Sequence, residues 1–499
     1  MSQMFDIVIV GGGINGVGIA RDAAGRGLSV FLAEKGDLAS GTSSAATKLI
    51  HGGLRYLEQY EFSLVREALS EREVLWRLAP HIIHPLRFIL PHHRGLRPTM
   101  LIRLGLFLYD YIGGRRKLPG SKAINLKQHE AGKVLKKEFE KGFEYSDCWV
   151  DDARLVVLNA LDAQNNGAEI HVGTEVVSAR KEEDCWRIKL KNCSGEELSD
   201  VRGRILINAA GPWAGSFLNG AVGSNSKGQV RLVKGSHIVV KKLFDHDKAY
   251  IFQNDDQRII FAIPYEGDYT LIGTTDVEYV GEPGDVKISQ DEIEYLCSAA
   301  SEYFEEEVVP ERVHWSYSGV RPLYDDGDAN PQEVTRDFVL DVDGKKGEPV
   351  LLNIFGGKLT TYRYLAEKAL EKLSPWISVS GPKWTHSKIL PGGDMPMEGF
   401  DDFTSKLKEK YSLLESGLVE RLARLYGTRV NRILSDVISM KDMGKHFGAD
   451  LYEREVEYLR KEEWARTADD ILWRRTKLGL RFNNQEKSML IEWLDKHKL

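Results

Sequence analysis

Cysteine is scarce in this chain, with four residues in 499. Cys148, Cys185, Cys193 and Cys297 are scattered and form neither a CxxC pair nor a cluster with histidine. This pattern argues against a disulfide framework and against a zinc site, and it suits a reducing compartment. We therefore expect no bound metal and a location that faces the cytosol.

Long apolar runs and an excess of positive charge are also missing. No apolar stretch approaches the ~20 residues that span a bilayer. The N-terminus enters an apolar run at once, so we expect no signal peptide. The formal net charge is −6 at pH 7, and we expect no nucleic-acid partner because such proteins usually present a basic face.

The first fifty residues hold the most specific pattern in the chain. An apolar run over residues 5–10 leads into Gly11-x-Gly13-x-x-Gly16, and a second run over 28–33 ends at Glu34. Gly11 permits a sharp turn, Gly13 lets the backbone approach a pyrophosphate, and Gly16 lets a helix pack close to a strand. Glu34 is placed to accept hydrogen bonds from ribose hydroxyls. The spacing therefore predicts a dinucleotide site, and an ordinary glycine-rich turn would not explain Glu34.

Hydrophobic periodicity predicts the other elements. Helices are expected over 61–79, 150–164 and 361–373, and strands over 169–179, 186–190, 204–209 and 350–354. Short strands over 230–233, 237–240, 259–263 and 270–273 suggest a mostly antiparallel sheet. A linker is expected near 375–393, and the charged remainder from about 400 reads as helical.

Several motifs together resemble one known family. Besides the opening glycines, they are Ser40-Gly41-Thr42-Ser43-Ser44, the run from Lys48 to Tyr56, Tyr317 to Leu323, and Phe355 to Tyr362. In this order they are similar to the FAD-dependent glycerol-3-phosphate dehydrogenases, within the D-amino-acid oxidase and glycine oxidase group. The resemblance extends over essentially the whole chain.

The resemblance implies an α/β and α+β architecture in three parts. A Rossmann-like FAD-binding domain would comprise 1–80, 151–229 and 319–380. An antiparallel-sheet substrate domain would comprise 81–150 and 230–318, and an α-helical C-terminal domain would cover 388–499.

The resemblance also implies an activity. It is the oxidation of sn-glycerol 3-phosphate to dihydroxyacetone phosphate, with hydride transfer from C2 to flavin N5 and electrons passed to a membrane quinone. The protein would be peripheral at the cytoplasmic face of the cell membrane, in part cytoplasmic, and a homodimer. An amine or amino-acid oxidase of the same fold is the alternative, and a non-enzymatic flavin-bound interaction protein is a second.

Positive side chains beside glycine turns fit a phosphate monoester, which carries about −1.5 to −2 charge at pH 7. Arginine can donate two hydrogen bonds to oxygen anions. The resemblance assigns the phosphate to the basic residues Arg55, Arg321, Arg336 and Lys358, with Tyr56 as a further substrate contact. Taken singly, each would read as a solvated surface charge.

A base must also take the proton of the C2 hydroxyl. His237 is the first candidate and His51 the second, because imidazole titrates near the working pH. Arg321 and Lys358 complete the expected catalytic set, and Lys358 would stabilise negative charge on the flavin. By its strand context alone, His237 reads rather as a core or edge histidine.

The expected cofactor contacts are carried over by motif position. They are Gly11, Gly13, Asn15, Gly16, Glu34, Thr42, Ser43, Ser44, Val176, Ala210, Gly211, Trp213, Gly357, Lys358, Leu359, Thr360 and Thr361.

Residues 94–117 form a basic, amphipathic stretch. Arg94, Arg97, Arg103, Arg115, Arg116 and Lys117 flank an apolar series from Met100 to Tyr109. Such a helix can bind an anionic lipid surface, because apolar burial and charge attraction add. A core helix with outward arginines is the other interpretation.

Overall fold

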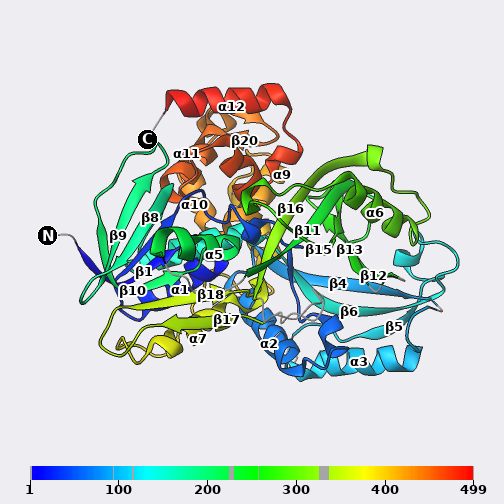
Figure 1. The fold of residues 1–499 in the computed structure, drawn as a ribbon. Helices are drawn as coiled ribbons and strands as arrows, with labels where there is room; N and C mark the ends of the chain where they lie inside the picture. The colour runs from blue at the N-terminus through cyan, green and yellow to red at the C-terminus, as the bar shows by residue number, and fades with distance from the viewer. Residues whose placement is uncertain are drawn as a thin grey trace.

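The computed structural model describes residues 3–93, 95–114, 117–223, 230–254, 256, 258–324 and 337–497. Arg336, Arg94, Arg115 and Arg116 lie outside the described residues. Two sheets stand side by side, and the C-terminal helices, orange to red in Figure 1, cover the region above them. The expected α/β class with a helical C-terminal domain is confirmed.

The first sheet has a parallel centre. Its order is β17-β18-β10-β1-β2-β7, with β9 paired to β10 and β8 to β9. Its strands are β1 Met4–Val10, β2 Val30–Glu34, β7 Glu169–Val172, β8 Thr174–Lys181, β9 Trp186–Asn192, β10 Val201–Asn208, β17 Val339–Asp343 and β18 Val350–Phe355. Neighbours of β1 run parallel to it on both sides, so their carboxyl ends meet at one edge. Ligands of open α/β sheets bind at this edge.

Helices cover this sheet through one apolar core. Ile7 and Ile9 of β1 are fully buried and share a cluster with residues of α1 (Ile14–Gly25), α4 (Asp152–Asn165) and α7 (Tyr362–Leu373). On the other face, Val8 packs in a cluster with Trp186 of β9. Both faces of β1 are therefore dry from Ile7 to Ile9, which explains the unbroken apolar run at the centre of this strand.

The second sheet is larger and mostly antiparallel. Its order is β15-β11-β14-β13-β12-β4-β6-β3, with β16 paired to β11 and β5 to β6. Its strands are β3 Leu49–Ile50, β4 Ile83–His92, β5 Lys122–Asn125, β6 Lys141–Val150, β11 Val230–Lys241, β12 Ala249–Gln253, β13 Ile259–Tyr265, β14 Tyr269–Gly273, β15 Val277–Glu278 and β16 Val313–Tyr324. Only β12 and β4 pair in parallel among the described strands of this sheet.

Two predicted strand limits were wrong. The separate strands expected over 230–233 and 237–240 form one strand, β11, because β16 pairs with it through Lys234, Gly235 and Ser236. The single strand expected over 169–179 is two strands, because Gly173 adopts a φ of +68° and turns the chain between β7 and β8.

Nine further α-helices occur in the described residues. They are α2 Phe62–Leu78, α3 Thr99–Ile112, α5 Ala214–Phe217, α6 Gln290–Ser301, α8 Phe400–Lys410, α9 Ser416–Tyr426, α10 Val430–Leu434, α11 Glu453–Glu462 and α12 Asn484–Lys496. Short turns of 3₁₀ or π helix include η1 Thr42–Ser44, η2 Leu54–Leu57, η8 Leu359–Thr361 and η11 Asp470–Arg475. No helix in the described ranges is long and apolar enough to cross a membrane.

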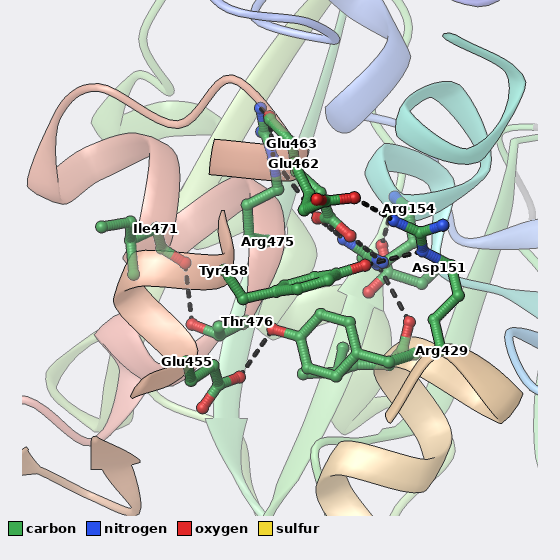
Figure 2. Close-up of polar contacts among 12 residues, drawn as sticks. Asp151, Arg154, Arg429, Glu455, Tyr458, Glu462, Glu463, Ile471, Arg475 and Thr476 are labelled. Carbon is green, nitrogen blue, oxygen red and sulfur yellow. Dashed lines mark hydrogen bonds and ion pairs between the residues drawn. The ribbon is translucent and has the colours of Figure 1, made fainter. Parts of the chain in front are cut away.

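The C-terminal part has its own apolar core, from Phe400 to Leu494. It also contains a small hairpin, β19 His446–Gly448 and β20 Leu451–Tyr452, that the helical pattern did not predict. Its contact with α4, which covers the first sheet, includes a buried polar cluster. Figure 2 shows Arg154 of α4 against Glu463, with Arg475 beside them. Arg154, Glu463 and Arg475 are all fully buried.

The division of the chain into six domain segments remains a prediction from the sequence. The proposed boundary between 318 and 319 falls inside β16, which pairs with β11 from Val313 to Tyr324. That strand carries Arg321 from the second sheet toward the first, so the segment boundary crosses the site itself.

Candidate active site

The glycine turn after β1 has the geometry that its sequence predicts. Gly11 adopts a φ of +111°, and a Cβ there would lie 2.4 Å from the carbonyl oxygen of Ala209. A Cβ on Gly16 would lie 2.0 Å from the oxygen of Gly11, so only glycine lets α1 approach the turn this closely.

Glu34 is held at the end of β2 by two backbone amides. The N–H groups of Gly12 and Gly36 donate to its two carboxylate oxygens, each at 2.7 Å. Burial raises the pKa of Glu34, and these two hydrogen bonds oppose the rise. The carboxylate is thereby fixed at the rim where a ribose would lie.

The start of α1 faces a polar loop. The side-chain oxygen of Ser43 accepts a hydrogen bond from the amide of Ile14 at 3.0 Å. Asn15 donates to the carbonyl oxygen of Gly356 at 3.2 Å, while its own Oδ1 is buried without a partner among the described residues. An unsatisfied buried acceptor in this position is expected to meet a ligand donor.

One cavity of about 1230 Å³ joins these groups to the second sheet. Of the predicted site residues, it is lined by Gly11, Gly13, Asn15, Glu34, Thr42, Ser43, His51, Arg55, Tyr56, Val176, Ala210, Gly211, Trp213, His237, Arg321, Gly357, Lys358, Leu359 and Thr360. Gly16, Ser44 and Thr361 do not line it, and Arg336 lies outside the described residues. Gly16 serves the packing of α1, and the Ser44 carbonyl accepts a hydrogen bond from Lys48 at 2.6 Å.

Three of the predicted cations reach the cavity from separate elements. Arg55 comes from η2, Arg321 from β16, and Lys358 from the turn before η8. Lys358 lies 3.9 Å above the ring centre of Tyr56, and Arg321 is 3.2 Å from a carboxylate oxygen of Asp276. Among the described residues, the guanidinium of Arg55 has no hydrogen-bond or ion-pair partner. This arrangement suits a multiply charged anion.

His237 lies on β11 at the wall of the same cavity. Its Nε2 is 3.0 Å from the hydroxyl of Thr47, and its buried Nδ1 has no partner in the described part of the chain. Burial lowers the pKa of His237 well below its usual value, and the charges of Lys48 and Arg321 lower it further. The imidazole is therefore neutral near pH 7.

His51 lines the same cavity and lies in the turn after β3. Its amide donates to the side chain of Thr360 at 3.3 Å. Burial also lowers the pKa of His51, with Lys358 and Arg72 acting in the same sense and Asp147 against them.

Sequence reasoning missed a support beneath the turn 51–53. The hydroxyl of Tyr109 on α3 accepts a hydrogen bond from the Gly52 amide at 2.8 Å and donates to Asp147, also at 2.8 Å. Arg72 pairs with Asp147 at 2.6 Å. No motif signals this set, because the three side chains come from α2, α3 and β6.

Lys48 was also missed as a functional candidate. It is buried behind the cavity wall, 2.7 Å from Asp152 and 4.9 Å from the ring centre of Tyr317. Tyr317 in turn stacks on His237. Arg258 is a further cation at the cavity that was not predicted, paired with Asp256 at 2.7 Å.

The residues present fit FAD. The cavity exceeds the ~300–1,000 Å³ of ordinary ligand pockets. It also runs without interruption from Glu34 and Val176 to Lys358 and His237. Gly211, with a φ of +56°, has open space where a Cβ would be.

Comparisons with known proteins agree with this geometry. The family "FAD dependent oxidoreductase" matches residues 6–363, and "C-terminal domain of alpha-glycerophosphate oxidase" matches 384–495. A glycerol-3-phosphate dehydrogenase from Pseudomonas aeruginosa is 52% identical over 99% of this chain and 96% of its own. D-erythritol 1-phosphate dehydrogenase from Brucella abortus is 51% identical over 99% of this chain and 98% of its own.

A solved structure shows the same fold. Glycerol-3-phosphate dehydrogenase from Bacillus halodurans, complexed with FAD, superposes with a TM-score of 0.79 and 27% identity, covering 99% of this chain and 90% of that one. Because the family match covers well over half of the sequence and the cavity suits the dinucleotide, this chain belongs to the FAD-dependent oxidoreductases and FAD is its cofactor.

Proposed function

We propose that this protein oxidises sn-glycerol 3-phosphate to dihydroxyacetone phosphate, by hydride transfer from C2 to flavin N5, and passes the electrons to a membrane quinone. Bound FAD supplies the two-electron acceptor. One observation carries the proposal: Arg55, Arg321 and Lys358 line the same cavity as the dinucleotide-binding residues.

Arg55, Arg321 and Lys358 support the proposed class of substrate. A phosphate dianion can be held by Arg321 and Arg55, with Lys358 adding a third positive charge. An amino acid presents one carboxylate, for which a single arginine is sufficient. The cation count therefore favours a phosphorylated alcohol over the amino-acid oxidase alternative.

The chain also offers acceptors for the hydroxyl proton. As C2 loses a hydride, its hydroxyl must lose a proton for the C=O bond to form. We assign the proton to His237, because its neutral imidazole lines the same cavity as the proposed phosphate-binding cations. His51 is the second candidate.

The proposed quinone and membrane contacts rest on α3. Only Leu106 and Tyr109 of this helix are buried, so it is not the core helix of the alternative interpretation. Its large exposed apolar residues are Met100, Leu101, Leu104, Phe107, Leu108 and Tyr111. Arg97, Arg103 and Lys117 are the described cations of this stretch. This face suits peripheral binding to the cytoplasmic leaflet, whose lipids are anionic.

A second cavity of about 230 Å³ opens between η2 and α3. Its lining is largely apolar, and it shares Leu54, Arg55, Ile251 and Ile259 with the large cavity. A lipid-soluble quinone that entered beside α3 would therefore stand next to the cofactor cavity.

D-erythritol 1-phosphate is a second candidate substrate. The Brucella abortus enzyme named for it matches this chain almost as closely as the Pseudomonas aeruginosa glycerol-3-phosphate dehydrogenase. Both compounds are polyol phosphates and would require the same cations.

Anaerobic mixing of the purified holoenzyme with each compound tests the proposal. We expect glycerol 3-phosphate to bleach the flavin absorbance near 450 nm within the turnover time, and erythritol 1-phosphate to do so more slowly. Bleaching only by erythritol 1-phosphate would transfer the assignment to it. Bleaching by glycine or D-amino acids, with hydrogen peroxide formed in air, would show an amino-acid oxidase.

A further inference from the structure

The loop over residues 36–41 forms part of the cofactor cavity. Gly36, Ser40 and Gly41 line it, and the Gly36 amide holds Glu34. Ala39 adopts a φ of +63°, which a residue other than glycine rarely adopts, and its amide donates to the Gly12 carbonyl at 3.2 Å. The loop thus needs outside support to keep this shape.

Asp37, the second residue of the loop, supplies that support. Its side chain is buried, with 5% exposure. Within the described residues, its carboxylate receives hydrogen bonds only from Arg474 and Arg475 of the C-terminal domain. The loop belongs to the part of the chain that forms the first sheet. The C-terminal helical domain provides the positive charges that pair with Asp37.

The two arginines are themselves fixed. Arg475 is fully buried and donates to both oxygens of Asp37, at 2.9 and 2.7 Å, and to the Glu463 carbonyl at 2.7 Å. Arg474 reaches Asp37 at 2.5 Å and also pairs with Asp470. Figure 2 shows Arg475 beside Glu463 at this interface. A two-pronged arginine contact fixes both direction and distance.

A second contact lies at the turn between β7 and β8. The Gly36 carbonyl accepts a hydrogen bond from Gly173 at 3.0 Å. A Cβ on Gly173 would lie 1.9 Å from the guanidinium of Arg466, so the C-terminal domain also covers this turn. The next residues, Thr174 to Val177, line the cavity.

We propose that the C-terminal helical domain holds the 36–41 loop in its FAD-binding shape, with Arg475 and Arg474 as positioning residues that act through Asp37. The domain contributes to cofactor retention without touching the reacting atoms. A preordered loop binds its ligand more tightly because less freedom is lost on binding.

The test is retention of FAD by the full-length holoenzyme. The holoenzyme of each variant, Arg475→Met and Asp37→Asn, is diluted. The release of FAD is then followed by the rise in flavin fluorescence. Equilibrium dialysis then gives the Kd. We expect each change to raise the Kd about tenfold or more, because each removes charged hydrogen bonds to the loop. This readout does not depend on the substrate.

Arg421→Met is the matched control. Arg421 forms a comparable two-pronged pair with buried Glu455, at 2.9 and 2.8 Å, inside the C-terminal domain and away from the loop. It should lower the melting temperature while leaving the Kd of FAD unchanged. An equal rise in Kd in all three variants, or a wild-type Kd in Asp37→Asn, would overturn the proposal. Asp37→Asn keeps the size of the side chain, so it serves if Arg475→Met does not fold.

Discussion

The imidazole of His237 lies parallel to the ring of Tyr317, with centroids 4.7 Å apart and 12° between the planes. The two residues are direct partners in the pairing of β11 with β16. The Tyr317 hydroxyl donates to the Ala46 carbonyl at 2.8 Å, and Thr47 lies against His237. The ring of His237 is therefore held from two sides.

Replacing His237 by alanine should slow anaerobic flavin reduction by glycerol 3-phosphate by about 10² or more, the typical contribution of a general base. Stopped-flow absorbance measures the rate. In the wild type, the low pKa of His237 keeps the ring neutral, so no loss of rate from its protonation is expected between pH 6 and 8. A normal rate in the variant would remove His237 as the base.

Arg321→Ala should lose most of kcat/KM for glycerol 3-phosphate and yet retain yellow FAD. The reason is that Arg321 approaches the cavity from the second sheet, whereas the glycine turn lies on the first. Steady-state kinetics and the absorbance spectrum together check this. Unchanged kinetics would contradict the assignment of the phosphate to this cation.

Lys48→Met should lower the free energy of unfolding by about 3–5 kcal/mol, because it leaves the buried carboxylate of Asp152 without its cation. The double variant with Asp152→Asn should recover most of the loss. Urea unfolding gives both values. Lys406→Met is the control, since its pair with Asp402 is exposed on both sides and should change little. Equal losses of unfolding free energy in Lys48→Met and Lys406→Met would show that burial of an ion pair does not affect its contribution to stability.

Acid should destabilise the protein through His81 and His84. Burial lowers the pKa of each to about 3. Both ring nitrogens of His81 also lack partners among the described residues. Between pH 6.5 and 3 the unfolded chain binds protons that the native chain does not. Unfolding free energy should therefore fall with pH by up to about 1.4 kcal/mol per unit for each histidine.

Urea unfolding of the wild type and of His81→Phe at pH 7.5 and 5.5 measures this loss. Between pH 7.5 and 5.5, His81→Phe should lose less unfolding free energy than the wild type. Above pH 6.5 the unfolding free energy of the two proteins should change with pH in the same way. Parallel losses in both proteins would contradict the expected role of His81.

Leu104→Glu on α3 should weaken binding to vesicles that contain anionic lipid, because it places a charge on the exposed apolar face. Flotation at low salt measures the bound fraction. Leu413→Glu, at a site 71% exposed on the C-terminal domain, is the control and should float like the wild type. Failure of the wild type to float at low salt would count against the membrane proposal.

The sequence by itself determined the cofactor half of the site. Gly11, Gly16 and Glu34 are local signals, because a tight turn, a close helix and a strand-end carboxylate each require a particular residue at a short spacing. The motifs also identified the family, and with it Arg55, Arg321 and Lys358 as candidates. Hydrophobic periodicity predicted α2, α4 and α7 and several strands. It did not predict β4, β6, β12, α6 or the β19–β20 hairpin, and it misplaced the limits of β7, β8 and β11.

Only the tertiary structure decided which distant charges meet. Asp37 and Arg475 are 438 residues apart, and no local pattern marks either one. The same holds for Lys48 with Asp152 and for Tyr109 beneath Gly52. Buried ion pairs and hydrogen bonds of this kind depend on how separate elements pack, and a single sequence carries no periodic signal for them.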